Sequence, residues 1–190
     1  VFSSEKLPGV EVSLGPEMKS TGEVIGLGSN VTEAMVKGFV AAGMMNKRGG
    51  VLISVNKRDR ELVLPVARVL ANEGCSLYAT PGTAKYLGIQ GLVVTAVPKI
   101  SQSHDALLKL LMDGHINIII DTPTRGREPE RDGFRMRRAA VERGVTCLTS
   151  LDTATALVQS MRSWSVLGCT HPIELGEANG RAGKAGKNPA

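Results

Sequence analysis

Between about residues 50 and 163 the chain alternates short apolar runs with longer amphipathic stretches. The apolar runs are 51–55, 75–79, 92–97, 116–120 and 146–148, and the stretches that read as helices are 61–73, 81–87, 103–112, 133–143 and 151–161. Strands that are apolar on both faces and alternate with helices are typical of a parallel sheet covered on both sides. With right-handed crossovers, this pattern predicts an α/β fold, a three-layer α/β/α domain on a five-stranded parallel sheet.

One residue conflicts with the helix predicted at 61–73. Pro65 lies inside it, where proline removes a hydrogen bond and clashes with the preceding turn. That helix therefore either begins near Leu62 or is kinked.

Three further segments flank this region. Residues 1–27 contain prolines and many glycines without sustained periodicity, so they are not expected to form a domain alone. Residues 28–48 are predicted to hold a connecting helix, because Asn30 and Glu33 have capping-box spacing and apolar residues follow at helical intervals. The extension at 164–190 has no clear structural pattern, and its end is expected to be mobile.

Composition narrows the classes of function. The net charge of +5 would suit nucleic acid, but aromatic residues make up only 3% of the 190 residues, too few for base stacking. No apolar run reaches the roughly 20 residues that span a bilayer, and the N-terminus lacks a signal-peptide layout. We therefore expect a cytoplasmic protein that binds neither nucleic acid nor membrane.

The usual metal and nucleophile patterns are not found. Cys75, Cys147 and Cys169 are odd in number and form no C-x-x-C pair, which argues against a disulfide framework and a zinc site. The three histidines have no metal-ligand spacing, and no Ser/His/Asp or Cys/His set can be assembled. No metal and no catalytic residue is expected.

The loops that follow the predicted strands are the best place for a ligand, because open parallel sheets bind ligands beyond the carboxyl ends of their strands. These loops hold Asn56 to Arg60, Thr80 to Thr83, Lys99, Asp121 to Arg125, and Thr149 with Ser150. Most of them offer hydroxyl groups or cations, which suit an anionic ligand.

The turn at 80–83 is the most informative of these loops. Thr80 can be the N-cap and Pro81 the first helical residue, while Gly82 leaves the backbone open to close approach. The unpaired N–H groups of a helix N-terminus attract anions, and Lys99 would add a full charge. The same residues also fit an ordinary capped helix beside an exposed lysine, so spacing alone leaves both interpretations open.

A family resemblance adds to this picture. The stretches EKLPGV at 5–10 and LGPEMKSTGEVIG at 14–26 closely resemble a segment of the carbamoyl-phosphate synthase large subunit. Downstream, ATPGTA at 79–84 resembles the family's A-T-x-G-T-A turn, and DTP at 121–123 with MRRAA at 136–140 resembles its N-T-P and I-R-R-x-A elements. The similarity extends to about Met161.

The resemblance implies a domain organisation. In that family the first segment ends the second ATP-grasp half, so residues 1–27 would be a remnant of it. Residues 49–163 would be a methylglyoxal-synthase-like domain that binds allosteric effectors, namely nucleotides such as UMP or IMP or other anionic metabolites.

The resemblance also implies roles for individual residues. Carried over by motif, Thr80, Gly82, Thr83 and Lys99 would surround the effector's phosphate, and Asp121 and Thr122 would lie near its base or sugar. Arg60 stands where some relatives have lysine. Asp121 replaces an asparagine of the relatives, which adds a negative charge where an anion is expected nearby.

The resemblance implies that this chain does not catalyse the reaction of its parent enzyme by itself. The parent enzyme uses ATP with Mg or Mn, bicarbonate and ammonia or glutamine to make carbamoyl phosphate for pyrimidine and arginine synthesis. In the parent enzyme this region works with the rest of the large subunit and with a glutaminase small subunit. Because the ATP-grasp body is not in this sequence, we expect neither catalysis nor a cofactor in this chain. The alternative is a stand-alone methylglyoxal synthase, a lyase that needs a carboxylate base after the third strand, where residues 97–103 carry none.

Overall fold

Five parallel strands form one sheet in the order β3-β2-β1-β4-β5. The computed structural model describes residues 24–44, 49–98, 104–123 and 132–167. The strands are β1 (Gly50–Ser54), β2 (Ser76–Ala79), β3 (Thr95–Ala96), β4 (Ile116–Asp121) and β5 (Thr146–Leu148), and each pair of neighbours is parallel. The predicted five-stranded parallel sheet is confirmed.

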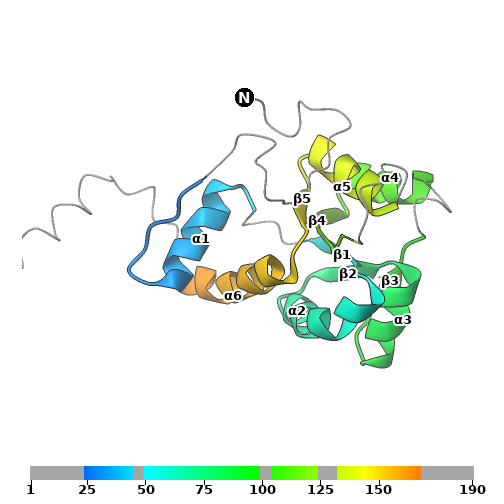
Figure 1. Cartoon of the computed structure of the whole chain (residues 1–190), viewed down its shortest axis with the longest axis horizontal. Coiled ribbons are helices and arrows are strands. Elements are labelled where there is room, and N and C mark those ends of the chain that lie inside the picture. The colour runs from blue at the N-terminus through cyan, green and yellow to red at the C-terminus, as the bar shows by residue number, and fades with distance from the viewer. Residues whose placement is uncertain (1–23, 45–48, 99–103, 124–131, 168–190) are drawn as a thin grey trace, which may run out of the picture.

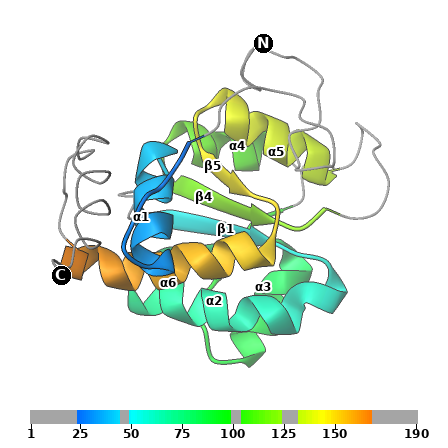
Figure 2. The same cartoon turned by 60° about the vertical axis from the view of Figure 1, so that its left-hand side comes forward.

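Helices cover both faces of this sheet. They are α1 (Val31–Ala41), α2 (Arg60–Asn72), α3 (Pro81–Ile89), α4 (His104–Met112), α5 (Asp132–Glu142) and α6 (Leu151–Leu167), with a short 3-10 turn η2 (Lys57–Asp59) before α2. Figures 1 and 2 show α4 and α5 on one side of the sheet and α2, α3 and α6 on the other.

Alternate residues of the central strands supply the two cores. Val51 and Ile53 of β1 pack with α2, α3 and α6, whereas Leu52 packs with α4 and α5. All three side chains are buried, since β1 lies in the middle of the sheet with helices above and below it. This burial on both faces explains why the strand is an uninterrupted apolar run.

The edge strand is much shorter than its apolar run predicts. The run at 92–97 becomes only Thr95–Ala96, which pair with Tyr78 and Ala79 of β2. Because β3 has a neighbour on one side only, both of its residues are exposed, as is Val93 just before it. An apolar run thus overstated the strand at the position where the sheet ends.

Two helix boundaries also differ from the prediction. Helix α2 begins at Arg60 with Pro65 inside it, so a start near Leu62 was wrong. Pro65 is exposed, which places its missing hydrogen bond on the solvent side of the helix. Helix α6 continues to Leu167, beyond the predicted end at Met161.

Helix α1 packs on the domain rather than standing apart from it. It lies beside α6 (Figure 2) and buries Val36 and Phe39, and Phe39 joins the core cluster that contains Leu157 and Val158 of α6. It ends at Ala41, before the end of the segment 28–48 that was predicted to hold it, and residues 45–48 lie outside the described part.

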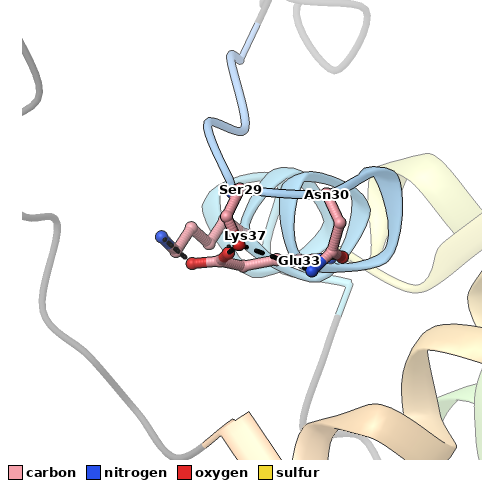
Figure 3. A network of polar contacts seen from close by, with 4 residues as sticks. All are labelled: Ser29, Asn30, Glu33 and Lys37. Atoms are coloured by element: carbon pink, nitrogen blue, oxygen red, sulfur yellow. Dashed lines mark hydrogen bonds and ion pairs between the residues drawn. The ribbon is translucent and has the colours of Figure 1, made fainter. Parts of the chain in front are cut away.

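The first turn of α1 departs from the capping box that its spacing predicts. Asn30 caps the helix as expected, its side chain accepting from the Glu33 N–H at 2.9 Å. The Glu33 carboxylate, however, accepts from the N–H and hydroxyl of Ser29 at 2.8 and 2.7 Å, and from Lys37 Nζ at 2.7 Å (Figure 3). Glu33 therefore ties the residue before the cap to the second turn of the helix.

Candidate anion-binding site

The carboxyl ends of three neighbouring strands bring the predicted site residues to one edge of the sheet. Thr80 follows β2, the η2 turn follows β1, and Thr122 follows β4, and these strands are adjacent in the order β2-β1-β4. The N–H of Thr80 donates to the Ile53 carbonyl, and the N–H of Thr122 donates to the Ser54 carbonyl, both at 3.2 Å. Backbone bonds to β1 therefore fix both loops.

Helix α3 begins as its sequence predicts. Thr80 is the extended N-cap and Pro81 the first helical residue, but the Thr80 hydroxyl does not cap the helix. It instead lies 3.4 Å from Thr83 Oγ1, to which it donates. Pro81 has no N–H, and the N–H groups of Thr83 and Ala84 donate to the Thr80 carbonyl, at 2.9 and 2.8 Å. The N–H of Gly82 is therefore the first-turn donor that can bind an anion.

Thr83 lies below the surface rather than on it. Its side chain is buried, and its hydroxyl donates to the Val55 carbonyl at 3.3 Å. The same oxygen can still accept, as it does from Thr80. Thr83 therefore connects the start of α3 to the end of β1, beneath Thr80.

The guanidinium of Arg60 lies against Gly82. A Cβ added at Gly82 would come within 2.5 Å of Arg60 Nη2, so only glycine allows this approach. Arg60 is also the first residue of α2, and its buried Nε has no hydrogen-bond partner among the described residues. A cation at the N-terminus of one helix and beside the N-terminus of another is in an unfavourable field, because helix N-termini are themselves positive. An anion beside Gly82 would balance the charge of the Arg60 guanidinium and the positive ends of both helices.

Asp121 at the end of β4 forms an ion pair that its sequence did not predict. Its carboxylate pairs with Arg137 of α5, and both side chains are buried. Gly133 in the first turn of α5 packs so closely that a Cβ there would lie 3.1 Å from Asp121 Oδ2. The negative charge that the sequence places near the site is therefore matched by a buried cation.

Two contacts were missed by sequence reasoning, and one predicted residue cannot be placed. Arg137 stands in the MRRAA element, which was the available signal for it. Asn56 carries no such signal, although its N–H donates to Thr122 Oγ1 at 3.3 Å. Lys99 and residues 124–131 lie outside the described residues.

The described residues contain neither a metal-binding cluster nor a membrane-spanning helix. No group of three or more His, Cys, Asp or Glu side chains in these ranges could hold a metal ion. No helix within the same ranges is long and apolar enough to cross a membrane.

Comparison with known proteins places the chain in a family. Residues 62–149 match the family model described as MGS-like domain. The carbamoyl phosphate synthase large chain of Clostridium beijerinckii is 45% identical over 159 residues, and that of Clostridium perfringens is 45% identical over 161 residues. These matches cover 83% and 84% of this chain, and 15% of each relative.

A solved structure supports the fold independently. The crystal structure of methylglyoxal synthase from Elizabethkingia anophelis superposes with a TM-score of 0.50 at 16% sequence identity, covering 67% of this chain and 95% of that one. At this identity the likeness concerns the fold alone. The chain therefore carries an MGS-like domain and belongs to the carbamoyl phosphate synthase large chains, of whose length it spans about 15%.

Proposed function

We propose that this chain binds a small phosphate-bearing effector at the carboxyl edge of its sheet and thereby regulates a carbamoyl phosphate synthase. The observation that carries the proposal is the position of Arg60. Arg60 begins α2 and its guanidinium lies beside Gly82 in the first turn of α3, and within the part of the chain that the structure describes its buried Nε has no hydrogen-bond partner. A phosphate beside the guanidinium would give this cation a partner and would also accept from the Gly82 N–H at the start of α3.

Each predicted site residue has a distinct part in this proposal. Arg60 pairs with the phosphate, Gly82 leaves room for the Arg60 guanidinium, and the Thr80 hydroxyl turns its O–H from Thr83 to the phosphate. Thr122, across the end of β1, contacts the rest of the ligand. Asp121, paired with Arg137, borders that side of the site. Lys99 is assigned to the phosphate by family resemblance alone.

The activity of the full-length protein is part of the same proposal. The relatives are named carbamoyl phosphate synthase large chain, and this chain spans about 15% of their length. We infer that the effector signal passes to the rest of such a large chain, which makes carbamoyl phosphate with ATP and a divalent metal and acts with a glutaminase small subunit in the cytoplasm.

A thermal-shift panel tests the proposal on the unmodified chain. The ligands are UMP, IMP, phosphoribosyl pyrophosphate, inorganic phosphate and ornithine, and uridine at the same concentration is the control that lacks only the phosphate. A ligand at a hundred times its dissociation constant stabilises the fold by about 2.7 kcal/mol, which raises Tm by roughly 5–10 °C. We expect UMP or IMP to raise Tm and uridine to leave it unchanged. Equal shifts from UMP and uridine, or none from any phosphorylated ligand, would contradict the proposal.

A further inference from the structure

Asn56 holds the turn from which Arg60 projects. Its side-chain Oδ1 accepts from the N–H groups of Arg58 and Asp59, at 2.8 and 3.2 Å, and so begins the η2 turn. This turn continues directly into α2, whose first residue is Arg60. Asp59, the residue before α2, makes no side-chain cap of its own. The orientation of Arg60 thus depends on the cap that Asn56 provides.

The other end of the same amide reaches the neighbouring strand. Asn56 Nδ2 donates to Asp59 Oδ2 at 2.5 Å and to Thr122 Oγ1 at 3.5 Å, and the Asn56 N–H donates to Thr122 Oγ1 at 3.3 Å. The acceptor Asp59 fixes which way the amide is turned. Its oxygen therefore faces the η2 turn, and its nitrogen faces Thr122.

These bonds determine what the Thr122 hydroxyl can offer. A hydroxyl has one donor and two acceptor lone pairs, and here both acceptor positions face donors of Asn56. The Thr122 O–H is then left to donate. A ligand group that meets Thr122 must be a hydrogen-bond acceptor, such as a carbonyl or hydroxyl oxygen.

We propose that Asn56 is a positioning residue that joins the two halves of the site, holding Arg60 for the phosphate and Thr122 as a donor to a second acceptor of the same ligand. This inference rests on the proposed function of the site. It assigns a role to a residue that contacts neither half of the ligand itself.

Two substitutions separate the two tasks of Asn56. Asn56→Ser keeps a good N-cap oxygen but loses the Nδ2 contact with Thr122, whereas Asn56→Ala loses the cap oxygen as well; the backbone N–H bond to Thr122 remains in both variants. In titrations with inorganic phosphate, which uses only the Arg60 half, we expect Asn56→Ser to bind like the wild type and Asn56→Ala to bind less tightly. In titrations with UMP we expect Asn56→Ser to bind roughly two- to tenfold less tightly, the value of one neutral hydrogen bond.

A double variant tests whether Asn56 acts through Thr122. Thr122→Val alone should weaken UMP binding by a similar factor, and adding Asn56→Ser to it should weaken binding no further. The inference is wrong if Asn56→Ser binds UMP like the wild type, if Thr122→Val has no effect, or if the two losses multiply.

The link between Asn56 and Thr122 can also be tested without a ligand, independently of the proposed function. NMR scalar couplings of Thr122 should report one side-chain rotamer in the wild type and averaging in Asn56→Ser. A single rotamer in both proteins would overturn the link even if UMP binds. A different outcome is rotamer averaging in Asn56→Ser with no binding of UMP or phosphate by the wild type. That outcome would refute the proposed function and the role of Asn56 in ligand binding, but the structural link between Asn56 and Thr122 would stand.

Discussion

The proposed site depends most on a single side chain, Arg60. It is the first residue of α2, and its guanidinium touches Gly82 in the first turn of α3. Cations are ordinarily favourable at helix C-termini rather than at N-termini. Nothing in the described residues pairs with its buried Nε, and under the proposed function an anion would balance the charge of this guanidinium.

Gly82→Ala should weaken phosphate binding without destabilising the fold. The new methyl group would come within 2.5 Å of Arg60 Nη2, so the guanidinium must move, whereas alanine itself favours a helix by up to about 1 kcal/mol. We expect at least a tenfold loss of phosphate affinity by calorimetry, roughly the value of one charge-assisted hydrogen bond, with Tm unchanged or raised. Gly88→Ala in the same helix is the control, because nothing lies within 4 Å of its Cβ position. Equal affinities for both variants would show that the place of Arg60 does not matter.

The buried pair of Asp121 and Arg137 should contribute strongly to stability. Removing one partner leaves an uncompensated buried charge, so Asp121→Asn should lower the free energy of unfolding by about 3–5 kcal/mol in urea titrations. Arg137→Met added to it should recover part of that loss. Glu142→Gln, which breaks the more exposed pair with Arg138 on the same helix, should cost less than about 1 kcal/mol. Losses that simply add in the double variant would argue against the pair.

Helix α1 packs into the same core as one face of the sheet. It lies against α6 and contributes Phe39 to the core cluster on that face. Its start is set by Asn30 and by the Glu33 carboxylate, which accepts from Ser29 and Lys37. An element that the sequence suggests as a connection is therefore a packed part of the domain.

Truncating Phe39 tests this packing. Phe39→Ala should lower the free energy of unfolding by about 3–5 kcal/mol, as expected for a large buried aromatic side chain. Val40→Ala on the same helix, where the side chain is 42% exposed, should change stability by no more than about 0.5 kcal/mol. If Phe39→Ala proves as mild as Val40→Ala in denaturant unfolding, α1 is only loosely attached.

Glu33 should titrate far below an ordinary glutamate. Hydrogen bonds from Lys37 and then from Ser29 lower its pKa from 4.5 to about 2. A carboxyl group whose pKa is lower in the folded state stabilises that state fully at pH values above its unfolded pKa. The contribution of Glu33 to stability is therefore present above about pH 4.5 and is lost as the pH falls toward 2. An NMR titration of the Glu33 carboxyl carbon should find its midpoint near pH 2, and Glu33→Gln should remove this part of the acid sensitivity of α1. A midpoint near 4.5 would mean that the contacts with Ser29 and Lys37 do not persist in solution.

At the scale of the whole molecule, the sequence predicts the architecture well and the site incompletely. Burial on both faces made the central strands visible as apolar runs, and the start of α3 was predicted from Thr80 and Pro81. Local patterns do not encode partners that are distant in sequence. Asn56 and Thr122 are 66 positions apart, and Asp121 meets Arg137 across the end of β4. The short β3 was overestimated because the sequence does not say which strand is at the edge.

The most direct test of the central claim is calorimetric titration of inorganic phosphate and UMP into the wild type, Arg60→Ala and Arg68→Ala at one fixed ionic strength. Arg68 is an exposed residue of the same helix, so its variant makes the same change in net charge away from the site. We predict that Arg68→Ala binds like the wild type and that Arg60→Ala binds roughly 10- to 100-fold less tightly, as expected for a lost charge-assisted contact. Phosphate and UMP binding to Arg60→Ala as tight as to the wild type would contradict the account.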